Sequence, residues 1–194
     1  MLFKYIYLFA MMLSVGWFVS SPDWEPVITF LGLFVAFLIN DREHSGRRSK
    51  ESKTSKLAQM DKKLFKMFLK TLPSKGSVQF LREHNMAGFS FKRSELSDLQ
   101  KFYYEWCDAE HEFSDTEMET KRKELHGCIG EYLNYLSINT WPTHISGFQS
   151  VPSEWELEQP TRFTEVVEKL HSMASTIVEQ HQELVRFGNS IQDA

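Results

Sequence analysis

The chain has 194 residues, of which 42% are hydrophobic and 25% are charged, and its formal net charge is −4. These averages are typical of an ordinary globular protein, and they exclude an intrinsically disordered chain, which would be poorer in apolar residues. Nine Gly and six Pro residues exclude a collagen-like or proline-rich fibre. The two cysteines, Cys107 and Cys128, are too few for a disulfide framework, so we expect them to be buried free thiols.

The first forty residues are far more apolar than the average. They contain only three formally charged side chains, Lys4, Asp23 and Glu25. Two apolar runs, at residues 5–19 and 27–39, are interrupted by a short polar turn. This pattern predicts an N-terminal two-span transmembrane hairpin.

The predicted spans cover about residues 3–20 and 22–40. The second span reaches its length through an N-cap at Ser21, followed by Pro22 at the first helical position. A cleaved signal peptide and a buried hairpin within a water-soluble core are the two alternatives for this segment.

The distribution of positive charge predicts how this hairpin is oriented. Nine basic residues lie between positions 40 and 66, and the turn between the spans carries none. The positive-inside rule therefore places both termini in the cytoplasm of a bacterial cell with the spans in its inner membrane, and the basic stretch on the anionic inner leaflet. The residues expected at the membrane interface are Lys4, Trp17, Trp24, Arg42, Arg47 and Arg48.

Each predicted span carries one pair of small residues at a spacing of four. The pairs are Ala10 with Ser14 and Gly32 with Ala36. Small residues on one helix face let two backbones approach closely. These faces are expected to pack within the hairpin, and a homo-oligomer is the alternative.

Beyond the hairpin, residues 41–60 are rich in Ser, Lys and Arg and predict a flexible or loosely helical juxtamembrane linker. Residues 61–190 show helical periodicity with no strand alternation, which predicts a cytoplasmic antiparallel bundle of about five helices and an all-α fold. Residues 89–92 predict only a brief extended piece. The expected helices are 61–72, 77–85 (closed by Gly88), 94–106, 114–139 (opened by a Ser114 and Glu117 capping box) and 160–188 (ended by Gly188 and Asn189).

The part of the chain from residue 67 to 194 is acidic. It holds twelve basic and twenty acidic residues, a formal charge of −8. This surface argues against direct binding of nucleic acid.

No P-loop, dinucleotide-binding, serine-hydrolase or zinc-protease motif is present, so no catalytic residue and no cofactor is predicted. The densest polar cluster is residues 108–115, in which Glu110, His111 and Glu112 are weak candidates for binding a divalent metal ion. The alternative is that these carboxylates serve the positive end of the following helix.

The segment between residues 140 and 159 is unusually long for a connection within a compact domain. Its aromatic residues Trp141, Phe148 and Trp155 are candidates for binding a partner. The alternative is a small hydrophobic cluster that covers the end of the bundle.

The run LPSKGSVQFLREHNMAGFSF at 72–91, with HEF at 111–113, looks like a widespread uncharacterised bacterial family. The architecture of a two-span hairpin, a basic stretch and a small helical domain resembles the two-helix transmembrane effectors encoded beside bacterial retrons and other anti-phage systems. The resemblance implies an inner-membrane effector that a protein or ribonucleoprotein partner, such as a reverse transcriptase complex, holds inactive. Its release would disrupt the membrane and abort infection.

Two other functions are compatible with the sequence. One is a membrane-anchored adaptor or regulator whose acidic helical domain binds a protein partner. The other is an enzyme at the membrane surface that uses the carboxylates and His111 of the 108–115 cluster.

Overall fold

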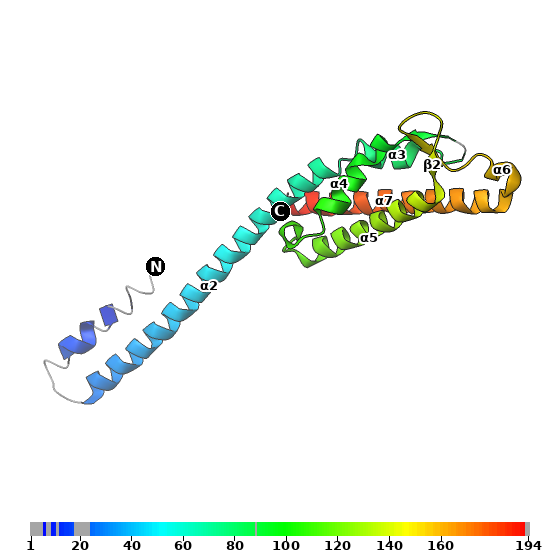
Figure 1. The fold of residues 1–194 in the computed structure, drawn as a ribbon. Coiled ribbons are helices and arrows are strands. Elements are labelled where there is room, and N and C mark those ends of the chain that lie inside the picture. Colours follow the sequence, from blue (N-terminus) through cyan, green and yellow to red (C-terminus); the bar gives the residue numbers. More distant parts are fainter. Residues whose placement is uncertain (1–5, 7–8, 11, 18–23, 88, 193–194) are drawn as a thin grey trace. The chain divides into compact units, whose positions relative to one another are not determined.

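The computed structural model describes residues 6, 9–10, 12–17, 24–87 and 89–192, and for residues 24–26, 39–55 and 192 it describes the backbone alone. The chain divides into two compact units, Met1–Lys56 and Leu57–Ala194. Most of the described residues are helical. In chain order the elements are α2 (Trp24–Thr71), α3 (Ser77–Glu83), β1 (Phe91–Lys92), the 3-10 helix η1 (Arg93–Leu96), α4 (Ser97–Glu105), the 3-10 helix η2 (Ala109–His111), α5 (Thr116–Asn139), β2 (Trp141–Pro142), β3 (Phe148–Ser150), α6 (Trp155–Glu158) and α7 (Pro160–Gln192) (Figure 1).

The described residues of the N-terminal unit do not form the predicted membrane spans, and part of the first span (3–20) lies outside them. Among the described residues, no helix combines the length and the apolar content needed to cross a bilayer. The uncharged run from Val27 to Ile39 gives roughly 20 Å of helix against a hydrocarbon core of ~30 Å. Helix α2 then continues from this run into Asp41 and Arg42 and through the whole of the expected linker. The predicted two-span hairpin and the inner-membrane localisation are therefore wrong.

The residues expected at a membrane interface lose that role with the spans. Trp17 is 47% exposed in the N-terminal unit. The backbones of Trp24, Arg42, Arg47 and Arg48 are helical within α2. Lys4 and the predicted cap at Ser21 and Pro22 lie outside the described residues.

The two small-residue pairs differ in their surroundings. Ser14 is buried, with 5% of its surface exposed, and Ala10 and Ala36 are half-buried. A Cβ added at Gly32 would meet no atom within 4 Å. Gly32 therefore does not mark a close contact between helices in the described part of the chain, and self-association stays a prediction.

The core of the C-terminal unit is centred on Phe68 of α2. Its ring centroid lies 5.7 Å from those of Phe102 in α4 and Trp106 after α4, and 5.6 Å from that of His181 in α7. All four side chains are fully buried. Three elements that are distant in sequence are thus held together by one aromatic cluster.

His181 is a polar member of this cluster. Its Nε2 lies 2.9 Å from the carbonyl oxygen of Leu72, which can only accept, so Nε2 carries the proton and donates it. Burial lowers the pKa of His181, and the charge of Arg82 acts in the same direction, while the Leu72 carbonyl partly opposes both. The imidazole is therefore kept neutral where α2 ends against α7.

Helices α5 and α7 run antiparallel along much of their length (Figure 1). Near one end Lys121 of α5 pairs with Glu183 of α7 at 3.4 Å. Towards the other end Tyr135 of α5 and Lys169 of α7 line the same shallow pocket. The expected antiparallel helix packing is therefore present.

The expectation of an all-α fold is wrong, because a three-stranded antiparallel sheet with the order β1–β3–β2 lies at one end of the helices. The sequence predicted β1 only as a brief extended piece and placed β3 in a loop. In the structure the two strands pair, with Phe91 opposite Gln149 and Lys92 opposite Phe148. On the other side, Trp141 of β2 is opposite Ser150. Such pairing escapes periodicity because strands of two or three residues show no alternation.

Gly188 does not end α7, as the sequence predicts, but lies within it. A Cβ at Gly188 would approach the ring of Phe65 to 2.2 Å, and Phe65 is itself 1% exposed. The glycine is therefore required by the close approach of α7 to α2 within the C-terminal unit and not by a helix end.

We predict opposite effects for two Gly→Ala substitutions in helices. Gly188→Ala should lower the free energy of unfolding by about 1–3 kcal/mol, because an added methyl group overpacks the Phe65 contact. Gly127→Ala in α5 should raise it by up to about 1 kcal/mol through helix propensity, because no atom lies within 4 Å of its Cβ position. Urea denaturation of both variants measures these changes, and equal effects would contradict the packing role of Gly188.

Candidate functional site

The long segment between α5 and α7 builds a groove, which we call the loop groove. It has a volume of about 470 Å³. Its wall combines apolar and small polar side chains from β2, the following turn and the residues after β3. Its lining includes Trp141, Pro142, Ile145, Ser150, Pro152 and Glu154.

Trp141 is the most prominent side chain of the loop groove. It is 55% exposed, and its ring meets that of Trp155 edge-to-face with centroids 5.7 Å apart. Trp155 is only 5% exposed, and the guanidinium of Arg162 from α7 lies 3.7 Å above its ring centroid. The exposed indole therefore rests on a buried one that is itself held by a cation–π contact.

Phe148, the third aromatic residue predicted to bind a partner, lies apart from this pair. It is half-buried in β3, and the Lys92 Nζ lies 5.7 Å from its ring centroid. The three aromatic residues predicted to bind a partner therefore differ in their roles. Trp155 and Phe148 contribute mainly to packing, whereas Trp141 presents an exposed apolar surface.

Some residues of the loop groove were not singled out from the sequence. Ile145, 48% exposed, and Pro152 line the groove with Trp141. Gly147 adopts a φ of 81° in the turn between β2 and β3, a conformation that favours glycine. The concentration of Trp, Pro and Gly in this segment is the signal that could have indicated a structured loop.

The 108–115 cluster is not assembled as a metal site. Glu110 and Glu112 are exposed, and the Oε1 of Glu112 lies 3.7 Å from the Nζ of Lys123. The ring of His111 packs against Trp106 with centroids 4.9 Å apart. In the described part of the chain, no three His, Cys, Asp or Glu side chains are grouped so that they could hold a metal ion. Cys107, expected to be buried, is exposed.

Acidic side chains in this region instead cap α5. Asp115, one residue later than the predicted Ser114, is the N-cap and accepts from the Met118 N–H at 2.9 Å. The buried carboxylate of Asp61 in α2 accepts from the N–H groups of Ser114 and Asp115, at 2.8 and 3.0 Å. The capping box is displaced because Asp61 already holds the backbone of Ser114.

Glu119 links the start of α5 to the core. It accepts from the N–H of Phe113 at 2.9 Å and pairs with Arg122, which is 4% exposed and also donates to the Trp106 carbonyl oxygen. Burial raises the pKa of Glu119, but the hydrogen bonds from Arg122 and Phe113 outweigh it, so the pKa lies below its ordinary value. The carboxylates around residue 115 therefore serve folding.

No protein-family model matches the chain, and the searches of curated proteins and of solved structures found no significant match. The function is therefore inferred from the geometry of the chain itself.

We predict that Asp61→Ala lowers the free energy of unfolding by about 1–3 kcal/mol, because it leaves two backbone N–H groups without their acceptor. The matched control is Asp108→Ala, which removes an exposed carboxylate of the cluster and should change stability by less than about 0.5 kcal/mol. Urea denaturation of the full chain measures both. A cost at Asp108 as large as that at Asp61 would contradict the capping role.

Proposed function

We propose that the chain is a protein-binding adaptor, in which the loop groove receives an extended basic segment of a partner protein. The observation that carries the proposal is the exposed ring of Trp141, whose position is fixed by two contacts, one of its backbone and one of its ring. Its strand pairs with β3, and its ring lies against the buried Trp155. Exposed Trp side chains in fixed positions are the commonest binding hot spots, because little conformational entropy is lost when they are covered.

The groove offers more than a single aromatic ring. Ile145 and two proline residues extend the apolar surface around Trp141. A volume of about 470 Å³ accommodates one or two side chains of an extended peptide, in the range of ordinary ligand pockets. The partner segment should therefore carry an apolar anchor residue.

The charge around the groove selects a basic partner. Among the described residues that line it, Glu154 is the only Asp, Glu, Lys or Arg. Glu156 and Glu158 follow in α6, and residues 67–194 together carry a formal charge of −8. Lys or Arg residues next to the anchor would be attracted to this surface, whereas nucleic acid would be repelled.

The other two expected functions receive less support from the geometry. The anti-phage effector stays an untested prediction, and its membrane-spanning part is contradicted by the described helices. The surface enzyme would need the 108–115 side chains to converge. They are exposed, cap α5 or pack against Trp106 instead.

A peptide-display selection on the immobilised full chain tests the proposal. We expect enriched peptides to carry an apolar anchor flanked by Lys or Arg. A labelled representative should bind Trp141→Ala about tenfold or more weakly than the unmodified chain, a typical hot-spot loss of about 2 kcal/mol. Glu154→Gln, at an exposed position, should weaken binding in a salt-dependent manner.

The matched control is Ile138→Ala, which removes an apolar side chain that is 60% exposed on α5 and does not line the loop groove. It should leave the affinity unchanged. Peptides that bind Trp141→Ala as tightly as the unmodified chain, or a selection that enriches no basic peptide, would refute the proposed function.

A further inference from the structure

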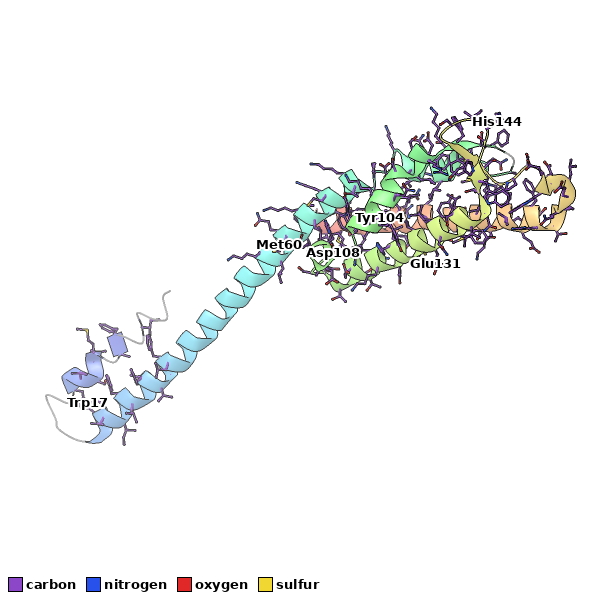
Figure 2. The ribbon with its side chains drawn as sticks, in the orientation of Figure 1. Trp17, Met60, Tyr104, Asp108, Glu131 and His144 are labelled. Atoms are coloured by element: carbon purple, nitrogen blue, oxygen red, sulfur yellow. The ribbon has the colours of Figure 1, made fainter. Side chains whose placement is uncertain are left out.

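A second concave site lies on another part of the C-terminal unit, between α4, α5 and the small sheet. This cavity, which we call the arginine cavity, has a volume of about 510 Å³. Figure 2 shows Tyr104, which lines it from α4, well separated from His144, which lines the loop groove. The cavity is therefore distinct from the loop groove.

One wall of the arginine cavity is aromatic. A Cβ at Gly130 of α5 would lie 2.6 Å from the ring of Tyr103, so the missing side chain lets this ring lie directly against the helix. Tyr103 also stacks on His126 at a centroid distance of 4.9 Å. Next to it, Tyr104 is 72% exposed, with its ring centroid 5.3 Å from that of Tyr103. The cavity thus presents a fixed ring beside an accessible one.

Arg93 and Gln149 contribute hydrogen-bond donors to the lining of the arginine cavity. The Arg93 Nε donates to the Oε1 of Gln149 at 3.2 Å. Because a guanidinium can only donate, this bond fixes which way the Gln149 amide faces and leaves its NH₂ group free to donate elsewhere. Although Gln149 as a whole is only 9% exposed, its NH₂ group donates to no acceptor among the described residues and remains accessible to solvent.

The charge of the arginine cavity is opposite to that of its surroundings. Among the described residues no Asp or Glu lines it, although residues 67–194 contain twenty. Arg93 is its only charged residue and forms no ion pair with a carboxylate in the described part of the chain. An anionic ligand would accept hydrogen bonds from both the Gln149 NH₂ group and the Arg93 guanidinium, and bonds to a charged acceptor are stronger than bonds between neutral groups.

We propose that the arginine cavity binds a small anion that carries a planar ring. Its carboxylate or phosphate group accepts from the Arg93 Nη atoms and from the Gln149 NH₂ group. Its ring packs on the exposed face of Tyr104. The volume of about 510 Å³ is sufficient for a single-ring carboxylate or for a nucleoside monophosphate.

Isothermal titration calorimetry of the full chain with two arms of probes tests this site. One arm holds the four ribonucleoside 5′-monophosphates, with the nucleosides and inorganic phosphate as matched halves. The other holds 4-hydroxybenzoate, with 4-hydroxybenzamide and acetate as its matched halves. We expect one arm to bind with a Kd below about 1 mM and its matched halves to bind about tenfold more weakly or not at all. The arm that binds identifies the anion as phosphate or carboxylate.

Three variants test the assigned residues. Arg93→Gln and Gln149→Leu should each weaken the binding probe about tenfold or more, because each removes a hydrogen bond to the charged group of the probe. Tyr104→Leu should weaken the ring-bearing probe and leave any residual binding of the bare anion unchanged. Circular dichroism and urea denaturation confirm that each variant is folded.

The matched control is Arg186→Gln. Arg186 is also an exposed arginine that donates to a glutamine, Gln182, at 3.2 Å, but it lies on α7 and does not line the cavity. This variant should bind the probe with unchanged affinity. The proposal is overturned if no probe of either arm binds, if the bare anion binds as tightly as its ring-bearing form, or if Arg93→Gln binds no more weakly than Arg186→Gln.

Discussion

The pairing of β3 with both β1 and β2 is the constraint on which both candidate sites depend. Strands of two and three residues cannot hold themselves together, so the sheet must be anchored to the helices. Phe91 of β1 and Val151 after β3 provide this anchor, with 3% and 1% of their surfaces exposed in the same core as Phe68. The backbone N–H of Arg93 donates to the Gly147 carbonyl at 3.1 Å and extends the pairing beyond the strands. The sheet is therefore a short connection fastened at its ends to a helical core.

Alternation of side chains along β3 gives this sheet two different surfaces. Ser150 lies opposite Trp141 and lines the loop groove, whereas Gln149, the neighbouring residue, is buried and lines the arginine cavity. The charged residues that line the two sites also differ in sign: Glu154 in the loop groove is negative, and Arg93 in the arginine cavity is positive. One short sheet thus borders both the groove proposed for a basic peptide and the cavity proposed for an anion.

Local features of the C-terminal unit could be predicted from the sequence, and contacts between distant residues could not. Apolar periodicity predicted α5 to within two residues, because its buried face, although it includes Arg122, recurs every three or four residues along the helix. The N-cap moved from Ser114 to Asp115 because Asp61, more than fifty residues earlier, binds the backbone there. Gly188 was mistaken for a helix end because nothing near it in sequence reveals Phe65.

Of the candidate site residues, Trp141 was identified from the sequence by its residue type. Arg93 and Gln149 could not be identified, because they come together only when β1 pairs with β3. The membrane hairpin was predicted from the apolar composition of the first forty residues. This prediction is wrong because no described helix is both long enough and apolar enough to cross a bilayer.

We propose that the sheet separates two binding surfaces. Side-chain N–H signals in ¹⁵N-correlated NMR spectra test it most directly, because the Trp141 indole and the Gln149 amide report on opposite faces of the sheet. Titration with a basic, apolar-anchored peptide should shift the Trp141 indole signal first, and titration with the ring-bearing anion should shift the Gln149 amide and Arg93 Nε signals first. Shifts of both sets by the same titrant in equal measure, or shifts confined to the outer faces of α5 and α7, would contradict the account.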